Sequence, residues 1–327
     1  MYHSRCFEQA VAKLWHQGKI SGEMHLSMGE EAICAGINEH LEAGDALALD
    51  HRGTAPALMC GVDPVALLKE FMGKPDGLCR GQGGHMHLFE PDLLVASSGI
   101  VGAAGPAGAG FALAAKYLRK GKISVAYFGE GAVNQGMLME SFNLAAAWQL
   151  PVLFVCKNNG WSITTESEKV TAGNLLDRLR AFGIQGEKVD GTSASAVWEA
   201  AGKMIGRIRR QNMPGFLLAQ CVHLEGHFLG DPMMELGQKP LKKAKELGGG
   251  LIKSVLHPGG GKIKDRTNAL QMIGSIMRDH LRPKVLEDRD PVRYLRKKLS
   301  LSDTEITDLE NDVKKEIDKI VTQAVSS

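Results

Sequence analysis

The stretch ISVAYFGEGAVNQG (123–136), together with PVLFVCKNNGW (151–161), decides the fold. Each begins with a run rich in β-branched and aromatic residues, which predicts a buried strand, and the residues between them (135–149) have helical spacing. A small, apolar segment at 105–118 predicts a helix before the first strand, and residues 216–222 predict a third strand. Helices and strands alternating in this order are typical of an α/β fold with a mostly parallel, doubly wound sheet.

Polar residues follow both strands at the point where each strand is expected to end. The sequence GEG (129–131) follows the first strand, and Asn158 and Asn159 follow the second. Because the carboxyl ends of parallel strands meet at one edge of a sheet, these residues should lie together where ligands bind. Side-chain oxygens of Glu130 and Asn159 and the backbone carbonyl of Trp161 suit a hard cation such as Mg²⁺, and the glycines let backbone N–H groups approach a phosphate.

Two common phosphate-binding turns do not fit this segment. The spacing is G-x-G-x-x-x-x-G rather than G-x-G-x-x-G, so a nicotinamide dinucleotide site is disfavoured. A Walker loop is excluded because no Gly-Lys-Ser/Thr follows. A turn with a purely structural role remains an alternative.

Composition narrows the class of protein further. The 327 residues carry 39 Lys plus Arg and 37 Asp plus Glu, a net charge of +2, which argues against a nucleic-acid partner. The longest apolar runs, such as 150–156, are too short for a bilayer, so no membrane partner is expected. No signal-like apolar stretch opens the chain, and the six cysteines form no C-x-x-C pair. We therefore expect a cytoplasmic protein with reduced, mostly buried thiols and no zinc site.

The rest of the chain divides into three expected parts. Residues 1–235 should form the α/β domain, 236–289 a basic insertion or arm, and 290–327 a helical tail; residues 238–298 hold 16 Lys/Arg against 6 Asp/Glu. The long segment 75–106 has no clean period, which is typical of a functional loop. Helical spacing further predicts helices at 6–18, 30–41, 64–72, 175–182, 195–210 and 303–325, and a short strand is expected at 47–49.

Residues 129–165 resemble the α subunit of thiamine diphosphate-dependent 2-oxo acid and acetoin dehydrogenases, of the pyruvate/acetoin type. HLSMGEEA (25–32) is similar to the family's His-Leu-x-x-Gly-Gln-Glu-Ala, and GLCRGQGGHMHLF (77–89) to its Gly-Lys-Gly-Gly-Ser-Met-His-Leu loop. Further matches follow in the family's order at HRG (51–53), SGIVGAAGP (98–106), EGHFLGD (225–231) and DPVRYLRKKL (290–299). The resemblance covers nearly all of residues 1–231 and 290–327 and implies a thiamine diphosphate-binding fold.

The resemblance also implies residue roles. Glu130, Asn159 and the carbonyl of Trp161 would hold Mg²⁺, Gly131 and Ala132 would offer amides to the diphosphate, and Ile163 would bend the cofactor. His227 and His25 would be the catalytic histidines, next to the reacting centre and on the substrate side. The residues expected to bind the cofactor are His51, Arg52, Gly99, Val101, Gly129, Glu130, Gly131, Ala132, Asn159, Trp161, Ile163 and His223.

Partners and substrates follow from the same resemblance. In this family a separate β subunit supplies the carboxylate that activates the cofactor, so the chain should be half of an active site in an assembly of two α and two β chains. Such an enzyme cleaves a pyruvate-like 2-oxo acid or acetoin and passes the two-carbon unit to lipoamide, on a lipoyl acyltransferase or carrier protein, or to another acceptor.

Four departures from the family pattern bear on the expected site and its regulation. Glu130 stands in place of Asp, His223 in place of a phosphate-holding Arg, Thr54 in place of His, and Phe228 in place of a Ser that some relatives phosphorylate. These departures keep two alternatives open. One is a stand-alone thiamine diphosphate-dependent acyltransferase or carboligase, and the other is a cofactor-poor structural or regulatory paralogue.

Overall fold

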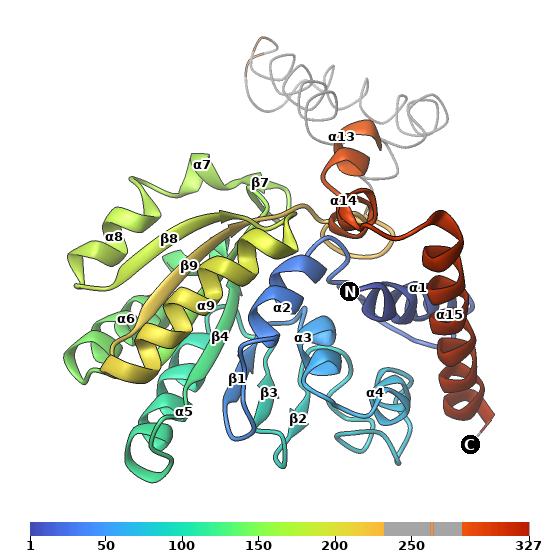
Figure 1. Cartoon of the computed structure of the whole chain (residues 1–327), viewed down its shortest axis with the longest axis horizontal. Coiled ribbons are helices and arrows are strands. Elements are labelled where there is room, and N and C mark those ends of the chain that lie inside the picture. The colour runs from blue at the N-terminus through green and yellow to red at the C-terminus, as the bar shows by residue number, and fades with distance from the viewer. Residues whose placement is uncertain (232–261, 263, 265–282, 327) are drawn as a thin grey trace.

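A seven-stranded sheet runs through the fold in the order β2-β3-β1-β4-β5-β9-β8, as the computed structural model shows for residues 1–231, 262, 264 and 283–326 (Figure 1). All neighbouring strands are parallel except the short pair β2 and β3. A separate antiparallel hairpin, β6 with β7, follows β5. The strands are β1 (Ala46–Leu49), β2 (Phe89–Glu90), β3 (Val95–Ser97), β4 (Ser124–Gly129), β5 (Val152–Asn158), β6 (Trp161–Ser162), β7 (Thr165–Glu166), β8 (Gln185–Asp190) and β9 (Gly215–Gln220).

Helices cover both faces of the sheet, so the predicted doubly wound α/β fold is confirmed (Figure 1). The helices are α1 (Tyr2–His16), α2 (Glu31–Asn38), α3 (Thr54–Met59), α4 (Pro64–Phe71), α5 (Ala104–Leu118), α6 (Gly136–Ala147), α7 (Ser167–Val170), α8 (Leu175–Ala181), α9 (Ala194–Gln211), α13 (Pro283–Asp288), α14 (Pro291–Lys298) and α15 (Asp303–Ser326), with a 3₁₀ turn η1 (Glu130–Asn134).

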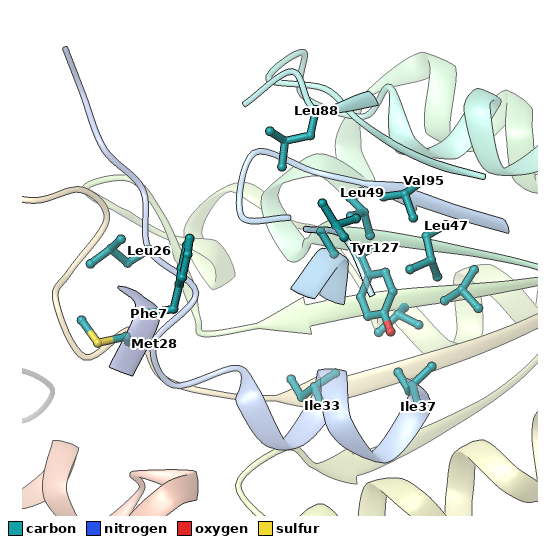
Figure 2. Packing of buried hydrophobic residues seen from close by; sticks show 14 of the residues in the cluster. Phe7, Leu26, Met28, Ile33, Ile37, Leu47, Leu49, Leu88, Val95 and Tyr127 are labelled. Atoms are coloured by element: carbon teal, nitrogen blue, oxygen red, sulfur yellow. The ribbon is translucent and has the colours of Figure 1, made fainter. Parts of the chain in front are cut away.

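Successive side chains of a strand point to opposite faces of the sheet, so the strands contribute to two separate hydrophobic cores. Val125 and Tyr127 of β4 lie in the core that α1, α2 and α9 cover, where Figure 2 shows Tyr127 among side chains of β1 and α2. Ala126 and Phe128, which point the other way, pack in the second core under α5, α6 and α8. Because both faces are buried, the central strands carry the nearly continuous apolar runs that identified them in the sequence.

The predicted central strands and main helices are present, with ends shifted by a few residues. Asp63 caps α4 by accepting a hydrogen bond from the N–H of Val65, as the Asp-Pro pair predicts. The strand β8 was not predicted, because five of its six residues are exposed at the edge of the sheet and it has no alternating apolar pattern. The short helix α3 and the strands β2 and β3 were also missed.

The long segment predicted at 75–106 is ordered around one buried carboxylate. Glu70 is fully buried, and its two oxygens accept hydrogen bonds from the backbone N–H groups of Cys79, Gly81, Gly83 and Gly84. A glycine is required at 83, because a Cβ there would lie 2.1 Å from the carbonyl oxygen of His87. These four hydrogen bonds hold residues 79–84 in place, although this stretch contains no helix or strand. The chain then continues into β2 and β3.

The C-terminal helix packs against the beginning of the chain. α15 lies beside α1 and α4 at one side of the fold, and it buries Ile306, Ile317 and Ile320 (Figure 1). Asp290, which caps α14, also forms a two-bond ion pair with the buried guanidinium of Arg5, at 2.9 and 3.0 Å. The expected basic insertion at 236–289 lies mostly outside the described residues, so the division of the chain into three parts stays a prediction.

All six cysteines are free in the structure, four of them buried and two half-buried, as the sequence analysis predicts. Among the described residues, every helix is too short or too polar to cross a membrane.

Candidate active site

A cavity of about 240 Å³ lies at the carboxyl edge of the sheet, where β1, β4 and β5 end. Its wall contains twelve of the fourteen residues that the sequence analysis selected, from segments far apart in the chain. These twelve are His51, Arg52, Val101, Gly129, Glu130, Gly131, Ala132, Asn159, Trp161, Ile163, His223 and His227.

The two remaining residues lie next to the wall. Gly99 sits between the lining residues Ser98 and Ile100, and a Cβ there would come within 3.1 Å of the sulfur of Met86. His25 packs its ring against those of His51 and His227, with centroids 4.7 and 5.0 Å apart. The structure therefore brings all the selected residues into one region.

Glu130 and Asn159 are joined by a hydrogen bond at the cavity wall. Glu130 begins η1 directly after β4, and one carboxylate oxygen accepts a hydrogen bond from the hydroxyl of Ser167 at 2.6 Å. Its other oxygen accepts the backbone N–H of Asn159 at 3.3 Å, while the side-chain oxygen of Asn159 accepts the N–H of Trp161 at 3.2 Å. Burial raises the pKa of Glu130, and the hydrogen bond from Ser167 opposes that shift. A bound dication would favour the ionised carboxylate.

Two buried polar atoms in the cavity wall have no protein partner. They are the hydroxyl oxygen of Ser162 and the Nε2 atom of His51. A buried polar atom without a partner costs about 1–3 kcal/mol, so these two favour a polar ligand in the cavity. Gly131 lies so close to Ser162 that a Cβ would fall 2.0 Å from the hydroxyl, which keeps this part of the wall free of a side chain. The donors present fit an anionic, metal-bound group.

The other side of the cavity is apolar and open. Ile100, Val101 and Ile163 are 62%, 53% and 57% exposed. Ile163 also has a φ of +56°, a left-handed conformation that is strained for a β-branched residue. Such strain persists where surrounding structure enforces it and is frequent at ligand sites. Ile163 follows β6 directly, so the hairpin holds this side chain at the cavity.

Four histidines form a cluster beside the cavity. His85 stacks on His25 with ring centroids 5.3 Å apart, and its Nε2 atom lies 3.1 Å from Nδ1 of His25. Burial, followed by the nearby charge of Arg52, lowers the pKa of His25 to about 2, and of His85 and His227 to about 4. Burial also lowers the pKa of His51 to about 3. The four imidazoles are therefore neutral near pH 7.

Arg52 is the cation in this cluster. The residue is 2% exposed, and its guanidinium donates hydrogen bonds to the backbone carbonyls of Leu26 and His227. Among the described residues, no carboxylate lies within ion-pair distance of it. Its positive charge can therefore act on an anionic group in the cavity.

Sequence reasoning missed a second charged group, which lies at the floor of the cavity. Lys157 is almost fully buried and pairs with Glu30 at 2.7 Å and Asp50 at 3.0 Å. Burial alone would raise the pKa of Glu30, but the charge of Lys157 and the hydrogen bond from His223 hold it down to about 2. The signal was present in the sequence, since Lys157 directly precedes Asn158-Asn159 and Glu30 stands where the family motif has Gln.

Comparison with known proteins agrees with this geometry. The family described as Dehydrogenase E1 component matches residues 1–246. The α subunit of acetoin:2,6-dichlorophenolindophenol oxidoreductase from Cupriavidus necator is 45% identical over 229 residues, which cover 69% of each chain. Its namesake from Bacillus subtilis is 40% identical, covering 71% of this chain and 70% of that one. The pyruvate dehydrogenase E1 component subunit alpha of Zymomonas mobilis is 36% identical, covering 74% and 69%.

The chain belongs to the dehydrogenase E1 component family. Its recognition as an enzyme α subunit of the acetoin and pyruvate dehydrogenase type is confirmed by these relatives, all of which are named as α subunits.

A buried carboxyl on α1 gives a pH-dependent prediction. Glu8 is fully buried and accepts hydrogen bonds from the N–H and hydroxyl of Ser27, so it holds the segment that carries His25 and Glu30. Burial raises the pKa of Glu8 to about 8. Because the folded state keeps the proton that the unfolded chain loses, this contribution to stability is complete below pH 4.5 and disappears as the pH rises through 8.

We expect Glu8→Gln, which keeps the acceptor oxygen and cannot ionise, to lose a smaller part of its unfolding free energy between pH 5.5 and 8.5 than the parent does. The difference should be on the order of a few kcal/mol in urea titrations. Glu199→Gln, at an exposed position, serves as the control and should behave like the parent. An identical pH dependence in Glu8→Gln and the parent would show that Glu8 is not protonated in the folded state.

Proposed function

We propose that the chain is the α subunit of a thiamine diphosphate-dependent enzyme that cleaves acetoin, or a pyruvate-like 2-oxo acid, and transfers the two-carbon unit to lipoamide or another acceptor. The observation that carries this proposal is one cavity whose wall combines the Glu130 carboxylate and the Asn159 amide with a buried cation and neutral histidines. Acetoin is favoured as substrate because the two acetoin relatives are 45% and 40% identical, against 36% for the Zymomonas pyruvate enzyme.

The polar end of the cavity would hold the diphosphate and Mg²⁺. Glu130, Asn159 and the carbonyl of Trp161 supply oxygen ligands of the kind that Mg²⁺ prefers. Gly131 and Ala132 would direct backbone amides at the diphosphate, and Gly129 leaves space for its approach. The charge of Arg52 would neutralise part of it, with the unpartnered Nε2 of His51 and hydroxyl of Ser162 as further polar contacts.

The apolar end would hold the rings of the cofactor. Backbone groups at Gly99 and Val101 would contact the aminopyrimidine, and the strained Ile163 would support the bent shape. When bound, thiamine diphosphate accepts the electron pair released as the bond beside a carbonyl is cleaved.

The neutral histidines would move protons on the substrate side. His227 lines the cavity, and its Nδ1 atom lies 3.3 Å from the guanidinium of Arg52, so the charge of Arg52 favours the neutral imidazole. A neutral imidazole has one N–H donor and one acceptor, so it can orient a substrate oxygen by donating a hydrogen bond, or accept a proton from a substrate hydroxyl. His25, packed against His227, would fix the substrate from the second side.

A β subunit would complete the site. The exposed side chains of Ile100, Val101 and Ile163 leave an apolar surface at the cavity, and large exposed apolar patches are rare in monomers. We propose an assembly of two α and two β chains, with a lipoyl acyltransferase or carrier protein as the recipient. The six free cysteines support the cytoplasm as its location.

Removing either proposed metal ligand should weaken cofactor binding. Glu130→Ala and Asn159→Ala each delete an oxygen that would face a dication, so the affinity for thiamine diphosphate in the presence of Mg²⁺ should fall at least about tenfold. Calorimetry on the α–β assembly measures this, with the exposed Glu168→Ala as control. Parent-like affinity in both variants would remove Glu130 and Asn159 from the metal site.

Activity should require the β chain. We expect the co-expressed α and β chains to reduce dichlorophenolindophenol with acetoin at a kcat/KM at least about tenfold above that with pyruvate, and the α chain alone to be inactive, because half of the site is missing. Turnover by the α chain alone would contradict the split site. An active assembly that forms carbon–carbon bonds but reduces no lipoamide would identify a carboligase, and an assembly that binds no cofactor a structural paralogue.

His227→Ala should lower turnover by ~10²–10⁴-fold, because the imidazole would act on protons that move during the reaction. Cofactor affinity should change only a few-fold. Steady-state kinetics and calorimetry on the assembly separate the two effects, and His16→Ala, at an exposed position on α1, controls for loss of an imidazole. Turnover within a few-fold of the parent would mean that His227 is not catalytic.

A further inference from the structure

We propose that His223, anchored by Glu30 and Lys157, is a positioning residue that turns the Asn159 amide so that its oxygen faces the metal. This inference rests on the proposed function, since it concerns how one proposed Mg²⁺ ligand is oriented. His223 follows β9, Glu30 precedes α2, and Lys157 lies near the end of β5, so three distant segments meet at Asn159.

The hydrogen bonds fix the orientation of the amide. The backbone N–H of Trp161 can only donate, so the atom of Asn159 that lies 3.2 Å from it has to be the carbonyl oxygen Oδ1. The NH₂ group of Asn159 then faces Nδ1 of His223 at 3.0 Å. Because that NH₂ group only donates, Nδ1 of His223 has to be the acceptor and carries no proton.

The same reasoning fixes the imidazole. With Nδ1 unprotonated, the ring proton is on Nε2, which lies 2.9 Å from a carboxylate oxygen of Glu30. Glu30 is 1% exposed, and its second oxygen accepts from Lys157 at 2.7 Å. Lys157 is held in turn by Asp50. A rotation of the Asn159 amide by half a turn would therefore place its NH₂ group against the N–H of Trp161 and its oxygen against Nδ1 of His223, two mismatched contacts.

Two departures from the family motif contact each other here. Glu30 stands where the motif has Gln, and His223 stands where many relatives have the phosphate-holding Arg. Both ring nitrogens of His223 have protein partners in the structure. The geometry therefore assigns His223 to the orientation of Asn159, and leaves Arg52 as the cation for the diphosphate.

Two substitutions at position 223 distinguish a role in orienting Asn159 from a role in filling space. A glutamine can donate its NH₂ group to Glu30 and accept from Asn159 through its oxygen, so His223→Gln preserves both hydrogen bonds. His223→Leu preserves neither. Glu30→Gln tests the anchor without changing 223, because an amide at position 30 has to turn its NH₂ group toward one of two donors, Lys157 or His223.

Metal affinity is the readout. In the full α–β assembly, saturated with thiamine diphosphate, the free Mn²⁺ signal in electron paramagnetic resonance gives the dissociation constant of the metal. We expect His223→Leu and Glu30→Gln to raise this constant about 10–100-fold, as loss of a residue that orients a ligand does, and His223→Gln to stay within about threefold of the parent. His85→Leu, which removes another buried imidazole near the cavity, should leave it unchanged.

Each other outcome has a defined meaning. If the parent assembly binds no Mn²⁺, both the proposed function and this inference are wrong. If the parent binds Mn²⁺ and His223→Leu and Glu30→Gln bind it equally well, the inference alone is wrong. If His223→Leu weakens the binding of inorganic diphosphate without metal, and His223→Gln does not restore it, His223 holds phosphate and does not position Asn159. Should His223→Leu not fold, Glu30→Gln decides.

Discussion

The buried ammonium group of Lys157, between the carboxylates of Glu30 and Asp50, is the interaction on which the carboxyl edge of the sheet depends. A buried charge costs several kcal/mol unless it is paired, so the three segments that carry these groups are held together. Lys157 belongs to β5, Asp50 follows β1, and Glu30 precedes α2. The ion pairs thus form the cavity floor. Asn159 closely follows Lys157 in the chain, and His51 and Arg52 follow Asp50, so the same pairs place these three residues around the cavity.

The central part of the fold could be predicted because burial on both faces imposes a visible pattern. Strands such as β4 and β5 have to be apolar at nearly every position, and helices between them show a period of 3.6 residues. The exposed edge strand β8 carries no such pattern. The loop around Glu70 was also beyond prediction, because its order comes from one carboxylate that accepts four backbone N–H groups, and no local rule reveals that partner.

Those residues of the candidate site that belong to short, continuous motifs could be predicted from the sequence. GEGAVNQG and KNNGW place Glu130 and Asn159 at neighbouring strand ends, and the structure brings them into contact. The contacts that orient these groups join residues far apart in sequence. Glu30 and His223 are 193 positions apart, and nothing in either local segment indicates that they meet. Sequence reasoning therefore identified the candidate ligands but not the residues that orient them.

The departures from the family pattern bear on whether the site still binds a cofactor. A site that had lost its ligand would be free to leave buried polar groups unpaired or to replace them with apolar ones, since such groups are costly. Here the longer Glu130 is held by the hydroxyl of Ser167, which lies 37 positions further along the chain, and His223 has a partner at each ring nitrogen. Two polar atoms of cavity-wall residues, Nε2 of His51 and the hydroxyl of Ser162, have no protein partner. The substituted residues Glu130 and His223 thus have hydrogen-bond partners in the protein, while two polar atoms of the cavity wall have none. This combination is expected of a site that still binds a polar ligand, and it argues against the cofactor-poor paralogue.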